Sequence, residues 1–228
     1  MTKISILTLF PQMFEGPLSE SIIKRAVNKD VVKINLVNLR DFAEDKHKTV
    51  DDTPYGGGAG MVLKPDVMDS ALQGIVGKNR GKYHVILLTP QGKRFDQREA
   101  ERLSKKDNLV LICGHYEGFD ERIREHMIDE EISLGDFVLS GGEIAAMAVT
   151  DAVVRLLPGA LGKDESSSEE TFSLQDEEGN ALLEYPHYTK PFDYKGWTVP
   201  EVLTSGNHAE IKKWRMAEAK KRTQEKHS

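Results

Sequence analysis

Short apolar runs alternate with amphipathic stretches along the first part of the chain. Four runs have the length and continuity of strands: Ile4–Phe10, Val31–Leu39, His84–Thr89 and Leu109–Cys113. Three of them are almost entirely apolar, which is typical of parallel strands buried on both faces. Between the runs lie segments with helical periodicity: Met13–Val27, Pro65–Val76, Asp96–Ser104, Phe119–Met127 and Glu143–Leu157. This alternation predicts an α/β fold with a mostly parallel sheet.

Local signals support several of these boundaries. Pro65 suits the first turn of a helix, because its missing N–H is not needed there. Asp96 can cap the next helix, with Glu99 three residues later as in a capping box. Pro158 and Gly159 end the most apolar helix of the chain.

The pattern changes beyond Gly159. Residues 162–180 are polar, acidic and serine-rich, and such a segment cannot bury enough apolar surface to order itself. Residues 207–224 then have the periodicity of one amphipathic helix, which Asn207 can cap. We therefore predict an α/β domain, a mobile acidic linker and a small helical C-terminal domain, over residues 1–160, 161–181 and 182–228.

Composition places the chain among globular intracellular proteins. Of its 228 residues, 39% are hydrophobic and 30% are charged, and no apolar run approaches the ~18 residues that cross a bilayer. Residues 1–10 read as a strand and lack the basic start of a secretory signal. A single cysteine, Cys113, excludes a disulfide framework and a cysteine-rich zinc site. We expect a cytoplasmic protein without a membrane segment.

Charge is unevenly distributed along the chain. The net charge of −6 does not mark the whole protein as a polyanion binder. Residues 164–178 hold acids and no Lys or Arg, whereas residues 207–228 hold seven bases against three acids. This basic tail is compatible with nucleic-acid binding, although by charge alone a solvated helix face is the simpler interpretation. Trp214 in the same helix could stack on RNA, but its amphipathic setting favours the core.

Three glycine-bearing loops are the candidate binding elements: Pro54–Met61, Cys113–Gly118 and Ile132–Glu143. Two of them follow apparent strand ends, where open α/β sheets bind ligands, and glycine lets the backbone approach a ligand closely. Any one loop alone is more simply a tight turn. Three in one α/β chain favour a cofactor pocket.

Common catalytic motifs are absent from the sequence. No G-x-G-x-x-G follows a strand, and no phosphate loop, G-x-S-x-G or H-E-x-x-H occurs. The histidines show no metal-ligand spacing, so no metal site is predicted from the pattern. His115 and His187 are catalytic candidates by position, yet a lone histidine is more often a hydrogen-bonded structural residue. Cys113 is more simply a buried small side chain than a nucleophile.

Seven segments, taken in order, resemble the bacterial tRNA (guanine-N1)-methyltransferases, a family of the knotted SPOUT class that modifies the guanosine 3′ to the anticodon. They are PYGGGAGMV (54–62), LTPQGKRF (88–95), ICGHYEGFDERI (112–123), DEEISLGDFVLSGGE (129–143), DAVVRLLPGALG (151–162), YPHYTKP (185–191) and SGNHAEIKKWR (205–215). The resemblance implies a trefoil-knotted α/β domain, methyl transfer from S-adenosylmethionine to N1 of guanosine 37 in tRNA, and a homodimer that shares its active site across the interface.

The resemblance also assigns residues to roles. S-adenosylmethionine would lie bent in the knot against Leu88, Pro90, Gly114, Tyr116, Glu117, Gly118, Ser133, Leu134, Gly135, Phe137, Leu139, Gly141 and Gly142. Transfer RNA would contact the C-terminal domain at Ser205, Asn207, His208, Lys212, Lys213 and Arg215. The family also depends on Mg²⁺; Glu117 and the linker carboxylates are candidate neighbours of such an ion, although no ligand spacing shows it.

The reaction itself demands a base and a cation. Guanine N1 carries a proton at neutral pH, so a carboxylate has to remove it as N1 attacks the methyl group. Negative charge then spreads onto O6, where a guanidinium can stabilise it. The family supplies an Arg on the last knot helix, matched by Arg155, and an Asp in the linker. Counting 15 residues on from Arg155 reaches Glu170, with Glu169 as the alternative base.

The linker departs from the family pattern at this point. Residues 169–173 read EETFS where the family has Asp-Asp-Ser-Phe-Ser. The extra methylene of Glu shifts the carboxylate by an ångström in scale, and a misplacement of about 1 Å can cost about a hundredfold in rate. Phe137 also stands where the family often has Tyr.

Three hypotheses follow from the sequence. The first, which we predict, is an active enzyme that makes 1-methylguanosine in tRNA. The second is a protein of the same fold that binds cofactor and RNA but is impaired in catalysis by the Glu and Thr replacements. The third is a small-molecule α/β enzyme with a nucleotide cofactor, which the basic C-terminal helix and the missing nucleotide motifs disfavour.

Overall fold

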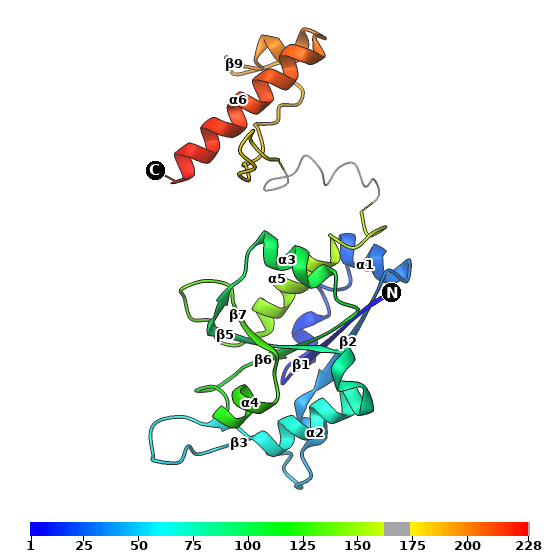
Figure 1. Cartoon of the computed structure of the whole chain (residues 1–228), viewed down its shortest axis with the longest axis vertical. Helices are drawn as coiled ribbons and strands as arrows, with labels where there is room; N and C mark the ends of the chain where they lie inside the picture. The colour runs from blue at the N-terminus through cyan, green and yellow to red at the C-terminus, as the bar shows by residue number, and fades with distance from the viewer. Residues whose placement is uncertain (162–173, 228) are drawn as a thin grey trace. The chain divides into compact units, whose positions relative to one another are not determined.

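A computed structural model describes residues 1–161 and 174–227 (Figure 1). The chain divides into two compact units, Met1–Gly162 and Lys163–Ser228.

A five-stranded parallel sheet forms the centre of the first unit, with the strand order β2-β1-β6-β5-β7. The strands are β1 (Thr2–Thr8), β2 (Val32–Asn38), β5 (His84–Arg94), β6 (Asn108–Cys113) and β7 (Glu130–Ser133), and a small separate hairpin joins β3 (Asp51–Asp52) to β4 (Val62–Leu63). The predicted α/β architecture with a mostly parallel sheet is confirmed. The apolar pattern does not predict β7, because two of its four residues are glutamates.

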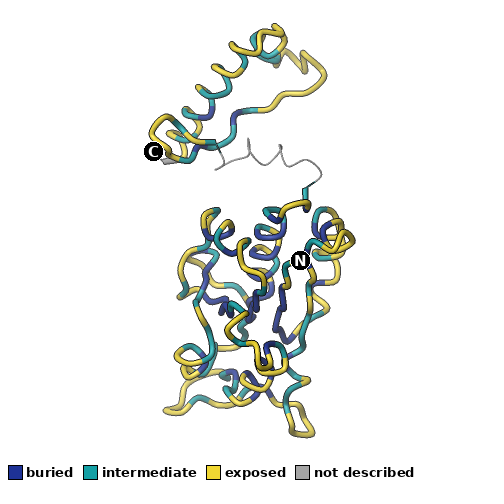
Figure 2. Tube along the Cα trace, turned by 45° about the vertical axis from the view of Figure 1, so that its right-hand side comes forward, coloured by how far each residue is buried: buried dark blue, intermediate teal, exposed yellow. Residues whose placement is uncertain are grey.

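Helices cover both faces of the sheet (Figure 1). One face carries α1 (Ser21–Asn28), α3 (Gln97–Ser104) and α5 (Glu143–Val154), and the other carries α2 (Pro65–Val76) and α4 (Glu121–His126). The buried part of the trace is concentrated in the sheet and in the helix sides that face it (Figure 2). Both faces of β5 and β6 are therefore inside the unit, which explains their continuous apolar runs.

One predicted helix is divided in two. The periodicity predicts a helix over Met13–Val27, whereas the structure has a short 3-10 turn, η1 (Pro11–Phe14), followed by α1 from Ser21. Pro17 lies between them. A proline has no N–H for the helical hydrogen bond and disfavours a helical conformation in the residue before it, so one continuous helix is excluded there.

Other helix boundaries lie close to the predictions. α2 spans Pro65–Val76 as predicted, and the Asp96 carboxylate caps α3 by accepting from the Glu99 N–H at 2.9 Å. The Glu99 side chain does not close a capping box but bonds Lys93 and Arg102. The Lys93 ammonium lowers the pKa of Glu99 below its usual value; burial opposes this, and the hydrogen bonds from Arg102 reinforce it.

The second unit is built around one long helix, α6 (His208–His227), where the sequence predicts a helix over 207–224. Leu182, Tyr185 and Ala219 form its small core, with Leu174 and Met216 packed against them. A short hairpin, β8 (Asp193–Tyr194) and β9 (Trp197–Thr198), and the 3-10 turn η5 (Glu201–Thr204) complete the unit. Residues 174–181, which the composition places in the linker, form a turn closed by a bridge between Gln175 and Ala181.

Candidate active site

The strand order creates a crevice at the carboxyl end of β5. The chain runs from β5 to its neighbour β6 on one side and then crosses to β7 on the other side. The loops that follow β6 and β7 therefore diverge around β5, the arrangement in which open α/β sheets bind ligands. A cavity of about 530 Å³ lies there, within the size range of small-molecule sites.

An irregularity in β5 forms one wall of the cavity. Leu88 and Lys93 both pair with Ile132 of β7, so residues 89–92 bulge out of the ladder. Gly92 makes this bulge possible, because a Cβ at that position would lie 2.5 Å from the Ile132 N. The Thr89 hydroxyl and the Gln91 side chain both accept hydrogen bonds from Arg124 of α4. These hydrogen bonds hold the bulge against α4.

Glycines hold the other two loops against each other. The Gly142 N–H, at the start of α5, donates to the Gly114 carbonyl at 2.9 Å, and a Cβ on Gly142 would lie 2.7 Å from the Cys113 Cα. A Cβ on Gly141 would lie 2.4 Å from the His115 ring. The loop after β6 and the loop before α5 are thus in backbone contact, and no larger residue fits between them.

A buried carboxylate, Glu143, stabilises the contact between these two loops. Glu143 is 1% exposed; it accepts from the Thr8 hydroxyl at 2.6 Å and bonds the His115 Nε2 at 2.7 Å. Because a buried carboxylate is stable only when it is hydrogen-bonded, this network specifies the position of His115 at the cavity. His115 is therefore a hydrogen-bonded residue that lines the site, and it connects β1, the loop after β6 and α5.

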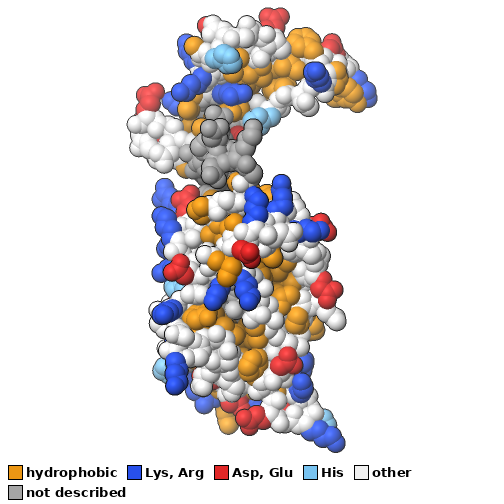
Figure 3. All heavy atoms as spheres, turned by 90° about the vertical axis from the view of Figure 1, so that its right-hand side faces the viewer, with side chains coloured by type: hydrophobic (Ala, Val, Ile, Leu, Met, Phe, Trp, Pro, Cys, Tyr) orange, Lys and Arg blue, Asp and Glu red, His pale blue; other side chains and the backbone are white. Residues whose placement is uncertain are grey.

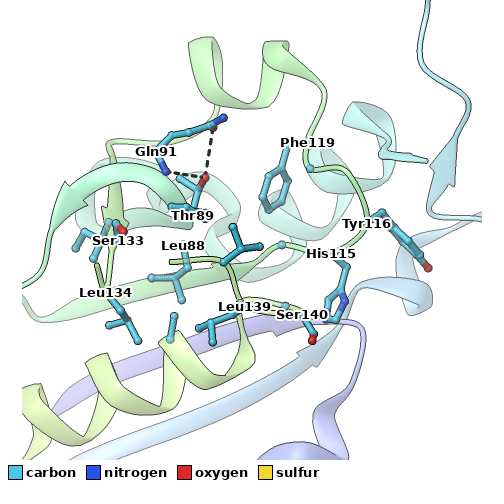
Figure 4. Close-up of a pocket in the computed structure, with 18 of the residues that line it drawn as sticks. Leu88, Thr89, Gln91, His115, Tyr116, Phe119, Ser133, Leu134, Leu139 and Ser140 are labelled. Atoms are coloured by element: carbon cyan, nitrogen blue, oxygen red, sulfur yellow. Dashed lines mark hydrogen bonds between the residues drawn. The ribbon is translucent and has the colours of Figure 1, made fainter. Parts of the chain in front are cut away.

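Apolar side chains line the centre of the cavity. Leu88, Leu134 and Leu139 turn towards a common space, whereas Tyr116 points away from them (Figure 4). Tyr116 has a left-handed backbone, with φ +61°, which is uncommon for a residue other than glycine and occurs here in the loop that forms the wall. The Ser133 hydroxyl is already satisfied by the Gly135 backbone, so backbone groups and leucines make up most of the contact surface.

The charge at the cavity favours a ligand without phosphates. Glu117 and Glu121 line it, and the one arginine of the lining, Arg124, faces Glu121 at 3.9 Å and Glu131 at 3.7 Å. A phosphate would therefore find no unpaired guanidinium among the described lining residues and would meet carboxylates. A positively charged ligand with a flat apolar ring fits these walls better.

All residues that the sequence analysis assigns to the cofactor line this one cavity. Sequence reasoning missed further lining residues, among them Thr89, Gln91, His115, Phe119, Arg124 and Ser140. All but Arg124 lie inside the quoted motifs and could have been assigned from them, and His115 is already a catalytic candidate by its position, whereas Arg124 on α4 lies just beyond a motif and carries no signal of its own. Cys113 is buried, and burial raises the pKa of its thiol well above the usual value, with the Glu143 carboxylate adding to the effect. The interpretation of Cys113 as an inert buried residue is confirmed.

Of the predicted catalytic pair, the structure describes Arg155, which is not among the residues that line this cavity. Arg155 forms the C-terminal cap of α5, whereas Gly142 and Ala145 at the N-terminal end of the same helix line the cavity. The helix of 12 residues separates the two ends by about 18 Å, which is more than an arginine side chain spans. Glu169 and Glu170 lie outside the described residues.

The predicted RNA-binding residues divide into three groups. His208, Lys212 and Arg215 line a second cavity inside the C-terminal unit. Ser205 and Asn207 stabilise the start of α6: Ser205 accepts from the Asn207 N–H at 3.1 Å, and Asn207 accepts from the Glu210 N–H at 3.3 Å. Lys213 is exposed. Trp214, which the pattern places in the core, is half-buried with its ring 6.4 Å from that of Tyr188.

The described ranges, 1–161 and 174–227, contain no group of three or more His, Cys, Asp or Glu side chains arranged to hold a metal ion. They also contain no helix with the length and apolar character needed to cross a bilayer.

Comparison with known proteins gives a consistent result over the whole chain. A protein-family model described as tRNA (Guanine-1)-methyltransferase TrmD matches residues 2–228. Curated proteins named tRNA (guanine-N(1)-)-methyltransferase from Bacillus licheniformis and Bacillus subtilis are each 56% identical over 221 residues, covering 97% of this chain and 88% of the relative. One from Dehalococcoides mccartyi is 55% identical, covering 97% of this chain and 87% of the relative.

Proposed function

The chain belongs to the bacterial tRNA (guanine-1)-methyltransferase family, and we propose that the cavity at the carboxyl end of β5 is its S-adenosylmethionine site. As a member of this SPOUT family, it transfers the methyl group of S-adenosylmethionine to N1 of guanosine 37 in tRNA. The observation that supports the site is the cavity itself. It combines leucine walls for a purine ring, backbone groups for its polar edge, and carboxylates in place of phosphate-binding cations.

S-adenosylmethionine supplies a methyl carbon bonded to a positively charged sulfur, from which a nucleophile can take it. The residues that would hold it are Leu88, Leu134 and Leu139 around the purine ring, and the backbone of the glycine loops along its edges. Glu117 and Glu121 would favour binding of the positively charged cofactor in the cavity.

Two side chains act on guanine in this proposal. The Glu170 carboxylate takes the N1 proton as N1 forms its bond to the methyl carbon and the carbon–sulfur bond breaks. The Arg155 guanidinium stabilises the negative charge that develops on O6. Glu169 is the alternative base one residue away, and the longer Glu side chain has to reach the position that Asp reaches in the family.

The position of Arg155 supports a homodimer in this proposal. One end of α5 contributes to the cavity and the other end carries Arg155, so a second copy would supply the guanidinium that meets the methyl group. The first unit has apolar side chains available for such an interface: Phe10, Met13, Phe137, Val138 and Ile144 are each 44% exposed or more. Exposed apolar side chains of this size are candidates for an association surface.

Three further points stay predictions from the resemblance. The trefoil knot would involve the residues around Gly92 and Gly142, where neighbouring backbone leaves no room for a Cβ, and around Gly114, where the Phe119 ring leaves none. Magnesium would have Glu117 as its neighbour, because Mg²⁺ is commonly bound through one or two carboxylates together with substrate and water. The basic C-terminal unit would hold tRNA through phosphate contacts, in the cytoplasm where tRNA is used.

The test is methyl transfer from labelled S-adenosylmethionine to two unmodified tRNA transcripts that differ only at position 37, guanosine in one and adenosine in the other. We expect label only in the guanosine transcript, released on digestion as 1-methylguanosine. Label in both transcripts, or in neither while the cofactor still binds, would contradict the assignment. The second of these outcomes would identify a binding protein impaired by the linker replacements.

A further inference from the structure

The C-terminal unit contains a cavity of its own, separate from the cofactor site. Its volume is about 460 Å³, and all of its lining comes from the segment around Tyr185–Tyr188, from η5, from α6 and from Leu174. One wall is aromatic: Tyr185 and His187 have ring centroids 4.9 Å apart, and Tyr188 is 49% exposed. Such a slot is large enough for one nucleotide.

The opposite wall is cationic. His208, Lys212 and Arg215 are four and three residues apart on α6, so they share one side of the helix. The Arg215 guanidinium lies 4.6 Å from the centre of the Tyr185 ring, which orients it by a cation–π contact. Lys, Arg and His side chains beside hydrophobic ones are visible on this unit in Figure 3.

Neutralising acids are scarce at this cavity. No Asp or Glu lines it, and the nearby Glu184 bonds His187 at 2.8 Å. Within residues 1–161 and 174–227, neither Lys212 nor the His208 side chain makes an ion pair or a hydrogen bond. An exposed aromatic ring beside a lysine that has no anionic partner among the described residues is an arrangement with which proteins hold an unpaired nucleotide: the ring stacks on the base and the basic side chain contacts the phosphate.

We propose that this cavity binds one unpaired nucleotide of the tRNA, other than the guanosine that is methylated, with its base against Tyr188 and its phosphate at Lys212 and His208. The proposal rests on the tRNA methyltransferase function and adds a second point of RNA recognition to it. A base held here would fix the register of the RNA, so that one guanosine is presented for transfer.

The first experiment measures the KM for tRNA, kcat, and the dissociation constant of S-adenosylmethionine for Tyr188→Leu and Lys212→Ala in the full chain. Loss of a base stack raises the KM for tRNA by about tenfold or more. The cofactor affinity should stay within twofold of wild type, and any fall in kcat should be smaller than the rise in the KM for tRNA. Tyr188→Phe keeps the ring and should restore the wild-type KM.

Matched controls on the same unit are Tyr194→Leu and Lys221→Ala, which remove an exposed tyrosine of the hairpin and a lysine of α6 that does not line the cavity. The logarithm of the tRNA binding constant falls linearly with the logarithm of the salt concentration. This slope should be shallower by roughly one unit in Lys212→Ala, which loses a phosphate contact, and unchanged in Tyr188→Leu. Equal effects of Tyr188→Leu and Tyr194→Leu would overturn the proposal. A change in oligomeric state with unchanged tRNA affinity would overturn it too, since the cavity would then hold the second subunit.

The second experiment identifies the nucleotide. Transcripts with a single abasic residue at each unpaired position are compared between wild type and Tyr188→Leu. At one position other than 37, the abasic residue should weaken tRNA binding by wild type. The same abasic residue should not weaken binding by Tyr188→Leu any further, because the ring and the base are partners in one contact. If the two proteins give the same pattern at every position, the proposal fails. Methylation of the intact transcript by wild type still tests the proposed function separately.

Discussion

Gly142→Ala is the most direct test of how the cofactor cavity is built. Gly142 starts α5, lines the cavity and donates its N–H to the Gly114 carbonyl at 2.9 Å. Its φ of −77° is ordinary for any residue, so alanine brings no backbone strain of its own. The whole effect of the substitution therefore comes from the added methyl group.

The structure gives the size of that effect. The new Cβ would lie 2.7 Å from the Cys113 Cα and 2.8 Å from the Gly114 N, whereas ordinary contacts begin near 3.4 Å. One backbone has to move by about 0.7 Å, and both backbones belong to the wall of the cavity. Overpacking of this kind costs about 1–3 kcal/mol of stability. If the same free energy is lost from cofactor binding, the dissociation constant of the cofactor rises by roughly tenfold to a hundredfold.

The assay compares Gly142→Ala with Gly81→Ala, a glycine without neighbours within 4 Å of its Cβ and with no left-handed backbone. Titration calorimetry gives the dissociation constant of S-adenosylmethionine, and thermal unfolding gives the stability. We expect Gly81→Ala to behave as wild type and Gly142→Ala to bind weakly and unfold several degrees lower. If Gly142→Ala matched Gly81→Ala in both measurements, the cavity would not be formed by this backbone contact.

Three further predictions concern single side chains. Arg155→Ala should lower kcat by about 10²–10³-fold and leave cofactor affinity unchanged, because Arg155 lies at the far end of α5; a large loss of cofactor binding would refute its placement. Glu170→Gln should lower kcat by about 10²–10⁴-fold, and Glu170→Asp should raise it; normal turnover of Glu170→Gln would transfer the role of base to Glu169. Glu99→Gln should destabilise the fold most near neutral pH. The folded pKa of Glu99 is below the ordinary value of 4.5, so its stabilisation is present above that pH and is lost as the pH falls through the folded pKa. Urea unfolding at several pH values checks this, and a pH-independent difference, or the same difference in the exposed Glu101→Gln, would contradict it.

The elements of the first unit could be read from the sequence wherever periodicity and local capping agree. α2 begins at Pro65 and ends at Val76 as predicted, because proline is favoured in the first turn and Gly77 follows the last residue. The prediction of one helix over Met13–Val27 is wrong. The apolar periodicity continues past Pro17, but a proline at that position interrupts the helix. β7 was missed because Glu130 and its neighbour Glu131 do not look like a buried strand. In the structure Glu130 bonds His84 and Arg102, so the charge is paired rather than solvated.

The candidate site was predictable only in part, and for a physical reason. Glycine loops after strands indicate where a backbone can meet a ligand, but they do not show which loops meet one another. The strand order decides that, because β6 and β7 flank β5 and bring their loops to one crevice. Arg124 reaches this crevice from α4, and no spacing in the sequence places it there.

The geometry of α5 has a consequence for the replacement at Glu170. A base on the same element as the cofactor wall would be held rigidly, and an extra methylene would then displace its carboxylate by its full length. The wall of the cavity is indeed rigid, since Glu143 is buried and bonded to both Thr8 and His115. Glu170, however, comes 15 residues after Arg155 in the sequence, beyond every described segment that lines the cavity. We therefore expect the longer side chain at position 170 to affect the rate of methyl transfer and not the binding of the cofactor. The rate and the cofactor affinity of Glu170→Asp, each relative to wild type, test this expectation: a higher rate at equal affinity supports it, and a changed affinity would refute it.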